Sequence, residues 1–255
     1  MPSSLAVPPP SAARALDGWT LHEWDEVSST NLAAAALPPW SAVRAAVQRA
    51  GRGRQGRPWV SDRGGLWFSA VLPTPGNTAP WALLPLAAGW AVLSAVRELG
   101  LSTARLRWPN DILVDRRKLA GILVDKFSSD AAVVGIGLNV FNHPAAADPA
   151  LADQAICLAD LLPAPPPPSD LLALLLPALA REHQRLEAGD AAALCHCLQN
   201  GWRPGRVQLT LTGSREILAG FFEGVDALGR LLLRGPTGAV QSLSPHHVDL
   251  LRETF

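Results

Sequence analysis

The stretch RWPNDILVDRRKLAGILV, residues 107–124, decides how the central part of the chain folds. Two apolar runs flank the polar triplet 115–117, a pattern typical of two antiparallel strands joined by a short turn. The proline fixes a bend before the first strand, so that Asn110 and Asp111 stand at its beginning. Because Lys118 begins the return strand, the hairpin predicts that an amide, a carboxylate and an ammonium group converge on one pocket. The alternative is a tight turn with an exposed lysine.

Strand-like patterns outnumber helical patterns on both sides of this hairpin. The charge-free run 80–96 approaches the length that crosses a membrane, but its proline and glycine and the following Arg97-Glu98 pair favour a buried core helix closed by Gly100. We therefore expect an α+β fold with a mixed, largely antiparallel sheet and helices on one face. The expected strands are 19–24, 42–48, 66–72, 105–108, 112–114, 119–124 and 131–140.

The chain changes character after the proline-rich spacer 163–168. Ser169-Asp170 is expected to cap a leucine-rich helix, and a further helix is expected over 190–199. From Arg206 onward, short alternating strands expected at 207–212, 217–225 and 231–233, separated by glycines, indicate a small β-barrel. The expected divisions are a disordered segment at 1–17, which is rich in proline, serine and alanine, a larger domain at 18–200, and a barrel domain at 201–255.

Charge and cysteine content limit the classes of function. The chain has 22 basic and 22 acidic residues, so no overall field attracts it to DNA or to an anionic membrane, and any attraction to anions must be local. Its three cysteines lack disulfide-like spacing, and residues 1–10 lack a secretory signal, so we expect a cytoplasmic protein. Cys195-His196-Cys197 lacks a second pair of zinc ligands, which favours a helical segment over a metal clip. His246-His247 is expected to lie in a passive surface turn.

The loop GRGRQGR, residues 51–57, places three glycines and three arginines between two expected strands. Glycine lets the backbone approach a phosphate closely, and guanidinium groups neutralise phosphate charge in bidentate contacts, so the loop suits a nucleotide or an acyl-phosphate. The alternatives are an RNA-binding segment and a merely solvated loop. The order Gly-x-x-x-x-Gly-Lys-Ser/Thr is absent, and no Gly-x-Gly-x-x-Gly turn leads from a strand into a helix, which excludes ordinary kinase and Rossmann sites.

Five motifs together resemble, in family order, the signatures of biotin–protein ligases. They are Ser29-Thr30-Asn31, Gly51 to Arg57, Trp108 to Asp111, Lys118 to Leu123, and Gly135 to Asn139. The resemblance implies a catalytic domain related to class II aminoacyl-tRNA synthetases, followed by an SH3-like barrel. It separates the chain from lipoate ligases and octanoyltransferases of the same fold, which lack the Trp-Pro-Asn-Asp signature. The winged helix with which larger family members bind DNA has no room before Trp19, so no DNA partner is expected.

The resemblance also implies an activity and a set of site residues. Biotin and ATP, accompanied by Mg²⁺, are the expected substrates. The expected partner is a biotin carboxyl carrier protein domain with its acceptor lysine. The sequence does not decide between a monomer and a homodimer. Arg52 and Arg54 are expected to close over the adenylate, Lys118 to bridge the carboxylate and the α-phosphate, and Asp111 to bind metal or assist the incoming amine. The remaining expected binding residues are Ser29, Thr30, Asn31, Gln48, Gly51, Gly53, Arg57, Trp59, Asn110, Gly121 and Asn139.

Several of these residues have structural alternatives. The side chains of residues 29–31 and Gln48 can donate to and accept from a ureido group. The alternatives are helix capping for Ser29 or Thr30 and strand-end solvation for Gln48. Trp59 suits a wall for the ligand or a core position, and Asn139 is assigned to the nucleotide end. Gln55 stands where the family often has a further arginine, which predicts weaker retention of the adenylate. The rival functions are a lipoate or octanoate enzyme, and a binding module for RNA or protein with salt-dependent affinity.

Overall fold

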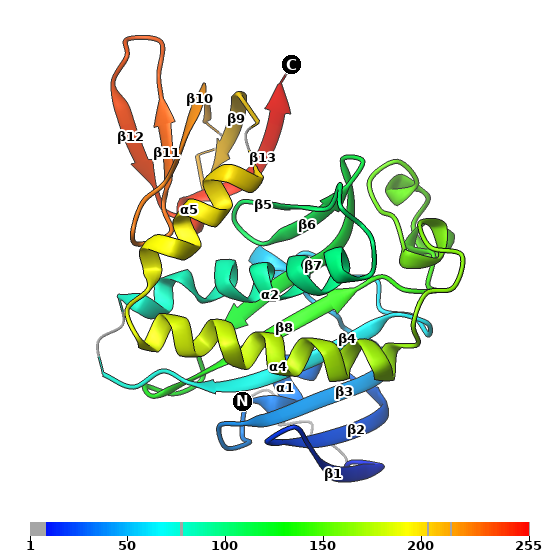
Figure 1. Cartoon of the computed structure of the whole chain (residues 1–255). Helices are drawn as coiled ribbons and strands as arrows, with labels where there is room; N and C mark the ends of the chain where they lie inside the picture. Colours follow the sequence, from blue (N-terminus) through cyan, green and yellow to red (C-terminus); the bar gives the residue numbers. More distant parts are fainter. Residues whose placement is uncertain (1–8, 77–78, 203, 215, 255) are drawn as a thin grey trace.

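The structure is a computed structural model that describes residues 9–76, 79–202, 204–214 and 216–254 (Figure 1). Within these ranges the strands form an eight-stranded sheet in the order β1-β2-β3-β4-β8-β7-β6-β5 and a five-stranded sheet in the order β12-β11-β10-β9-β13. The strands of the larger sheet are β1 (Ala12–Leu16), β2 (Trp19–Val27), β3 (Ser41–Gln48), β4 (Leu66–Pro73), β5 (Arg105–Arg107), β6 (Asp111–Val114), β7 (Arg117–Asp125) and β8 (Ala131–Leu138).

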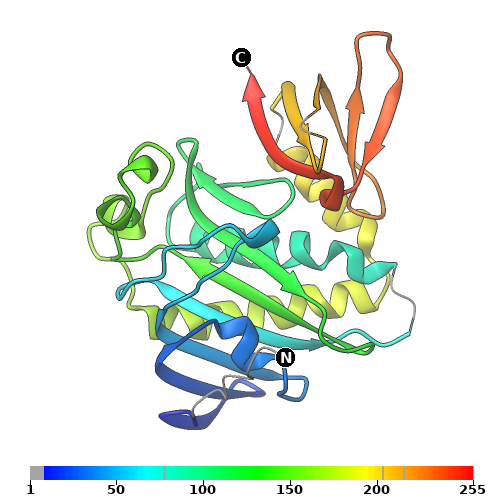
Figure 2. The ribbon, with the colours of Figure 1, turned by 180° about the vertical axis from the view of Figure 1, so that it is seen from behind.

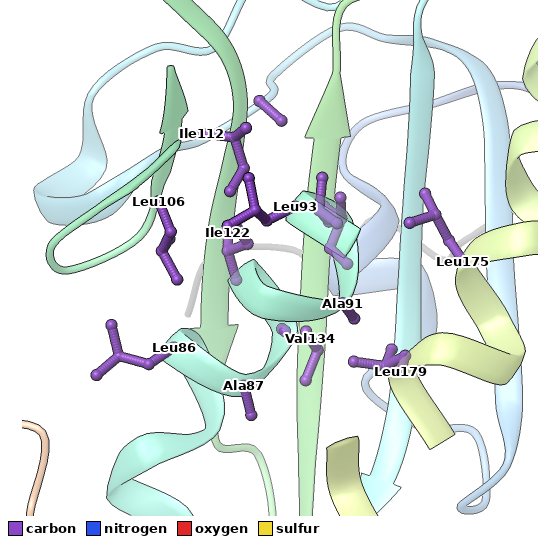
Figure 3. Close-up of a cluster of buried hydrophobic side chains, with 14 of the residues drawn as sticks. Leu86, Ala87, Ala91, Leu93, Leu106, Ile112, Ile122, Val134, Leu175 and Leu179 are labelled. Atoms are coloured by element: carbon purple, nitrogen blue, oxygen red, sulfur yellow. The ribbon is translucent and has the colours of Figure 1, made fainter. Parts of the chain in front are cut away.

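The larger sheet is mixed and largely antiparallel, as the sequence predicts. The pair β2 and β3 is parallel, and the other neighbouring strands run antiparallel. Helices α2 (Leu84–Glu98) and α4 (Pro168–Glu187) pack on one face. There α2 lies over Ile122 of β7 and Val134 of β8, with Leu179 of α4 beside it (Figure 3). Burial of this apolar layer provides the main stabilising contribution to the fold.

The expectation that all helices lie on one face is incomplete. Helix α1 (Thr30–Ala34) covers the opposite face, which Figure 2 shows as the short blue helix in front of the strands. Its alanines pack with Val43, Val71 and Val133 of β3, β4 and β8. Because alternate residues of a strand point to opposite faces, these valines expose an apolar surface that needs its own cover.

The apolar run after β4 is a core helix, as expected. Pro80–Glu98 is apolar and long enough to cross a membrane by length and composition alone, but most of it is buried inside the protein. A short 3-10 turn, Pro80–Leu83, leads into α2. Gly100 then ends the helix with a φ of +97°, and its N–H donates to the Arg97 carbonyl at 2.9 Å, which is the glycine termination that the sequence predicts.

The N-terminal expectation needs a correction. Residues 12–16 form strand β1, antiparallel to β2, with Leu16 opposite Trp19. The turn between them is Asp17-Gly18, whose φ values of +48° and +84° match a tight two-residue hairpin. The Asp-Gly pair therefore orders a segment whose composition alone indicated disorder. The first eight residues of that segment lie outside the described residues.

The smaller sheet consists of β9 (Arg206–Leu211), β10 (Ile217–Val225), β11 (Leu231–Arg234), β12 (Val240–Leu243) and β13 (Val248–Thr254). The first three strands match the prediction, whereas β12 and β13 were missed. Helix α5 (Ala191–Gly201) precedes them and contains the Cys195-His196-Cys197 segment, which confirms its helical interpretation; the Cys197 side chain lies outside the described residues. Helix α4 begins at Pro168, ahead of the predicted Ser169-Asp170 cap, because proline suits the first helical turn.

The two sheets are joined around a buried tryptophan. Trp108 is 1% exposed, and its Nε1 donates to the Gly229 carbonyl in the loop between β10 and β11 at 2.9 Å. A Cβ atom at Gly229 would meet Leu83 at 3.1 Å and Leu86 at 3.4 Å, so this loop lies directly on the beginning of α2. The smaller sheet therefore sits against the end of the larger sheet that carries β5 and β6 (Figure 1).

Candidate active site

A pocket of about 430 Å³ opens between the larger sheet and the beginning of β13. The predicted site residues that line it are Ser29, Thr30, Asn31, Gln48, Arg52, Gly53, Arg54, Arg57, Trp59, Asn110, Asp111, Lys118, Gly121 and Asn139. The remaining one, Gly51, lies beneath the loop, where a Cβ atom would come within 2.5 Å of Ser61 Oγ and of the Trp59 carbonyl oxygen. Segments more than 100 residues apart in the sequence thus meet at one cavity.

The pocket has a local excess of positive charge although the whole chain is neutral. Three acidic side chains, those of Asp111, Asp153 and Asp249, face twice as many basic ones. A partly enclosed cavity of this kind concentrates field lines and attracts anions. The basic residues are Arg52, Arg54, Arg57, Arg107, Arg116 and Lys118.

Lys118, Asp111 and Arg107 form an ion-pair cluster in the wall of the pocket. Lys118 Nζ lies 2.7 Å from Asp111 Oδ1, and an Arg107 terminal nitrogen lies 2.6 Å from Asp111 Oδ2. Burial of Asp111, whose side chain is 13% exposed, opposes its ionisation, but the two cations outweigh this and lower the pKa of its carboxyl. Asp111 therefore stays an anion and holds both cations in place.

The hairpin of β6 and β7 sets the position of Lys118. Asp115 and Arg116 form its turn with φ values of +48° and +67°, so the turn is one residue shorter than the predicted triplet. Asp111 lies opposite Gly121 in the register of the two strands. A Cβ atom at Gly121 would lie 3.0 Å from Lys118 Cε and 3.2 Å from Trp59, so the glycine leaves the space that both side chains occupy.

A hydrogen-bonded polar network lies in another part of the pocket lining and behind it. Gln48 Oε1 accepts from the Thr30 backbone N–H at 2.8 Å and from Thr30 Oγ1 at 3.0 Å. Ser69 Oγ lies 2.7 Å from Thr30 Oγ1 and 2.6 Å from Asn31 Oδ1. The Ser29 side chain makes no helix-capping bond, so the capping alternative does not account for it. Ser69 was missed by sequence reasoning because it lies in the middle of an apolar strand.

Two glycines of β8 make room for this network. A Cβ atom at Gly135 would overlap with Asn31 Oδ1, and one at Gly137 would lie 2.5 Å from Trp59 Nε1. Within the described residues Trp59 Nε1 is buried and has no hydrogen-bond partner, although Trp59 lines the pocket. A buried donor without a partner is uncommon in a folded protein and marks a place where a ligand can accept a bond.

The Arg/Gly loop is bound to the smaller sheet, which the sequence did not predict. Arg54 donates to the Pro245 carbonyl and, at 3.0 Å, to the Val248 carbonyl, while Arg57 donates to the Asp249 carbonyl at 3.0 Å. Gln55 adds a long bond of 3.3 Å to Thr212 Oγ1. Burial lowers the pKa of Arg54 and the Asp111 carboxylate opposes this, so the guanidinium remains a cation at neutral pH. In this structure Arg54 therefore serves to hold the loop closed.

Two predicted ligand contacts are engaged within the protein instead. The Asn139 amide donates to the Lys118 carbonyl at 3.3 Å and the Ile156 carbonyl at 3.1 Å, and its Oδ1 accepts from Asn142 at 3.0 Å. The Asn110 amide donates to the Ile122 carbonyl at 2.7 Å. Both asparagines thus stabilise the strands around the pocket that they also line, and the assignment of Asn139 to the nucleotide end stays a prediction.

Comparisons with known proteins identify the family to which the chain belongs. The model described as the biotin/lipoate A/B protein ligase family matches residues 25–140. A biotin–[acetyl-CoA-carboxylase] ligase of Paracoccus denitrificans is 36% identical over 232 residues, which cover 82% of this chain and 92% of that protein. One of Mycobacterium tuberculosis is 36% identical, over 73% of this chain and 70% of that protein. The biotin protein ligase of Aquifex aeolicus, solved with biotin and ATP, superposes with a TM-score of 0.78 at 25% identity, covering 92% of this chain and 99% of that chain.

Proposed function

The chain belongs to the biotin–[acetyl-CoA-carboxylase] ligases of the biotin/lipoate A/B protein ligase family, and we propose that its pocket activates biotin with ATP and transfers it to a carrier protein. The main support for this proposal is that two chemically different groups of side chains line the pocket. A cationic cluster around Lys118 and a network of hydroxyl and amide groups around Thr30 and Gln48 line the same pocket. Biotin has the same division, with a carboxylate on one side and a ureido ring on the other.

The first half-reaction joins two anions. A biotin carboxylate oxygen attacks the α-phosphorus of ATP, the bond to the bridging oxygen breaks, and pyrophosphate leaves with biotinyl-5′-AMP as the product. Lys118, held 2.7 Å from Asp111, presents its ammonium group to the forming carboxyl–phosphoryl linkage. Because the cations are fixed before the reaction, little reorganisation is needed as charge develops.

The second half-reaction takes place at the acyl carbon. A neutral lysine amine of the biotin carboxyl carrier protein domain attacks this carbon, AMP leaves with the bonding electrons, the nitrogen releases a proton to solvent, and an amide bond forms. The loop 51–57, tied by Arg54 and Arg57 to the smaller sheet, closes one side of the cavity and keeps water from the adenylate. The side chains of Asn31 and Gln48, fixed by hydrogen bonds to Asp125 and Ser61, form the wall against which the ureido ring is oriented.

Mg²⁺ would neutralise the charge of the ATP phosphates in this reaction. Both carboxylate oxygens of Asp111 are already engaged, one by Lys118 at 2.7 Å and the other by Arg107 at 2.6 Å. We therefore assign Asp111 to positioning these two cations, while the phosphates supply oxygen ligands of the kind that magnesium prefers. The chain's own contribution is to hold Lys118 and Arg107.

The same proposal covers the domain division, the cellular location and the oligomeric state of the protein. Residues 18–200 would form a domain related to class II aminoacyl-tRNA synthetases, and residues 201–255 an SH3-like barrel. The mixed sheet and the separate antiparallel sheet support this division. The protein would act in the cytoplasm without DNA or a membrane, as a monomer or a homodimer.

Transfer of labelled biotin tests the proposal directly. Purified protein, ATP, Mg²⁺ and an acceptor carrier domain should yield labelled carrier, and omission of ATP should abolish the label. A carrier whose acceptor lysine is replaced by arginine is the control. Lipoate and octanoate serve as competitors: transfer of either in preference to biotin would favour the lipoate-type alternative. Failure of the folded protein to label the carrier or to release pyrophosphate would contradict the proposal.

A further inference from the structure

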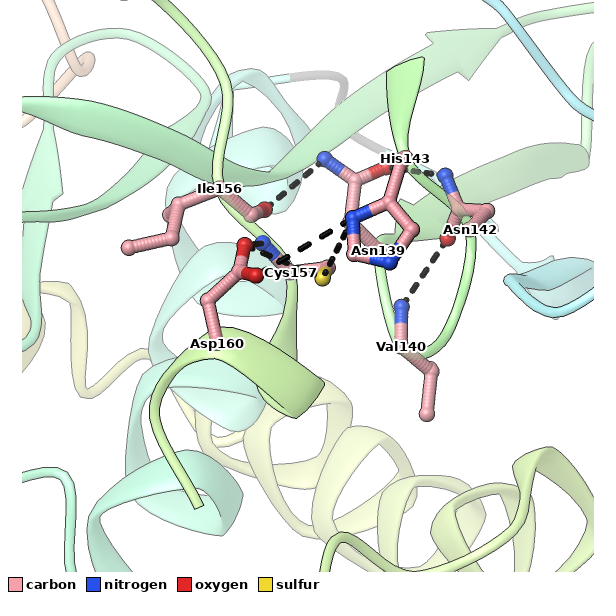
Figure 4. A network of polar contacts seen from close by, with 7 residues as sticks. All are labelled: Asn139, Val140, Asn142, His143, Ile156, Cys157 and Asp160. Carbon is pink, nitrogen blue, oxygen red and sulfur yellow. Dashed lines mark hydrogen bonds and ion pairs between the residues drawn. The ribbon is translucent and has the colours of Figure 1, made fainter. Parts of the chain in front are cut away.

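A second cluster of chemically reactive side chains lies beside the active-site pocket and outside it. Cys157 Sγ lies 3.6 Å from His143 Nδ1 and 3.1 Å from Asp160 Oδ2, and His143 Nδ1 lies 3.9 Å from Asp160 Oδ1 (Figure 4). One ligand atom from each of the three residues falls within 4.8 Å of the others. None of the three lines the pocket, so the function proposed above does not use them.

The residue types and their separations match a metal site. Zinc binds a cysteine thiolate at about 2.3 Å and a histidine nitrogen or a carboxylate oxygen at about 2.0 to 2.2 Å, in a tetrahedral arrangement. These bond lengths place neighbouring ligand atoms roughly 3.4 to 3.6 Å apart. The observed separations of 3.1, 3.6 and 3.9 Å involve both oxygens of Asp160, and one ligand atom from each residue lies within 4.8 Å of the others. A rotation of the exposed His143 and Asp160 side chains therefore brings all three residues onto one ion.

The backbone fixes the cluster while leaving it accessible. The Cys157 backbone N–H donates to Asp160 Oδ2 at 3.1 Å, which orients the carboxylate toward the sulfur. Cys157 is buried, whereas the side chains of His143 and Asp160 are 60% and 41% exposed. An ion can therefore enter from solvent, and a water molecule or an external ligand can complete the fourth position.

We propose that His143, Cys157 and Asp160 bind a divalent cation of the zinc class, with a nitrogen, a sulfur and an oxygen ligand and one open position. On binding, the thiol proton passes to solvent and the sulfur bonds to the metal as a thiolate. A soft sulfur ligand beside an imidazole selects zinc or cobalt over magnesium and calcium, which prefer oxygen ligands. This site is thus distinct in chemistry from the magnesium that accompanies ATP.

The site is connected to the active site through one residue. Ile156, next to Cys157, accepts from Asn139 Nδ2 at 3.1 Å and donates its backbone N–H to the Lys118 carbonyl at 3.1 Å (Figure 4 shows the Asn139 contact). A bound ion fixes Cys157 and therefore holds the segment that borders Lys118. Since the ion binds the folded chain, its binding free energy adds to stability.

Cobalt titration of the untagged full chain tests the proposal. The metal-free protein should bind one equivalent of Co²⁺ with a thiolate-to-cobalt charge-transfer absorption, and Zn²⁺ should displace it and raise the melting temperature. His143→Ala and Cys157→Ser should each weaken Co²⁺ binding by more than about a hundredfold. Mutation of a residue that only hydrogen-bonds to a metal ligand already lowers metal affinity by roughly 10- to 100-fold. His143→Ala keeps the experiment readable if Cys157→Ser fails to fold, since the imidazole is mostly exposed.

Cys195→Ser and His247→Ala are the matched controls. Cys195 is the other buried cysteine whose side chain is described, and it donates to the Asp226 carbonyl in the loop between β10 and β11. Both controls should bind Co²⁺ as the wild type does. Absence of a charge-transfer band in the folded wild type would overturn the proposal. So would a band that persists in His143→Ala, or one that disappears in Cys195→Ser, which would place the metal on the 195–197 segment.

Discussion

Lys118 and Asp111 stand on neighbouring strands with their charged atoms 2.7 Å apart, and Arg107 completes the cluster. Two cations around one carboxylate leave a positive charge directed into the pocket. Lys118 also lies 4.9 Å from the centre of the Trp59 ring, a cation–π distance that further fixes its ammonium group. These contacts explain why one lysine is held at a defined point although its side chain is 30% exposed.

Lys118→Ala should lower the rate of biotinyl-adenylate formation by about 10²- to 10³-fold, because removal of one preorganised charge partner of a transition state costs that much. The melting temperature should change little, since Asp111 keeps its ion pair with Arg107. Pyrophosphate release measures the rate. Lys126→Ala, at the chain's other lysine, is the control and should react normally; near-normal release from Lys118→Ala would contradict the assigned role.

The buried carboxyl of Glu182 should make the free energy of unfolding depend on pH. Burial raises the pKa of this carboxyl, and the ion pairs with Arg185 and Arg181 offset this only in part. Folding therefore favours the protonated form: its contribution to stability is present below the ordinary glutamate pKa of about 4.3 and is lost as the pH rises through the raised pKa. Glu182→Gln, which stays neutral, should lack this loss. Urea unfolding at pH 4 to 7 should show the variant gaining stability relative to the wild type, and a constant difference would refute this.

Strand β8 makes room for the site because two of its residues are glycines without side chains. Gly135 and Gly137 alternate along the strand with Ile136, so the glycines face the pocket while the isoleucine is buried on the α2 side of the sheet. The missing Cβ atoms leave space for Asn31 and Trp59. A strand with two glycines is weaker by itself, and its pairing with β4 and β7 compensates.

Gly137→Ala should displace Trp59 and weaken biotin binding by roughly tenfold or more, because forcing a methyl group into a filled space costs about 1 to 3 kcal/mol and 1.4 kcal/mol corresponds to a factor of ten. Isothermal titration with biotin measures the affinity. Gly201→Ala is the matched control, since a Cβ atom there meets no atom within 4 Å. Unchanged affinity in Gly137→Ala would show that Trp59 is not part of the binding wall.

Local sequence signals predicted most helices and strands, but they failed for strands that form only because they pair with a neighbouring strand. The hairpin at 111–125 was predicted because its turn and apolar runs are adjacent in sequence. Strand β12 was missed because its exposed residues show no burial pattern, and it exists through pairing with β11. The Asp17-Gly18 pair is a local signal for the turn before β2, whereas the proline-rich composition that precedes it is typical of a disordered segment.

At the scale of the whole molecule, the smaller sheet completes the pocket. The carbonyls of Pro245, Val248 and Asp249 receive the guanidinium groups of the loop, and Trp108 bonds the Gly229 carbonyl. No sequence pattern predicts these contacts, because they join residues between 121 and 194 positions apart. The motifs identified the residues of the site, whereas the partners of Arg54 required the assembled fold.

Arg54→Ala should release the loop from the smaller sheet. Hydrogen exchange of amides in 51–57 and 245–249 should accelerate in the ligand-free variant, because two charged hydrogen bonds to backbone carbonyls are lost. Adenylate formation should fall as well, since an open loop admits water to the cavity. Arg52→Ala, which removes an exposed side chain from the same loop, is the exchange control. Equal exchange in both variants and the wild type would contradict the closing role of Arg54.

The most direct measurement is a crystal structure of this protein with a non-hydrolysable analogue of biotinyl-5′-AMP. The account predicts the analogue in the pocket of about 430 Å³, with its ureido ring at Asn31 and Gln48 and its phosphate within hydrogen-bonding distance of Lys118 Nζ. An analogue bound elsewhere, or one whose phosphate lies away from Lys118, would contradict it.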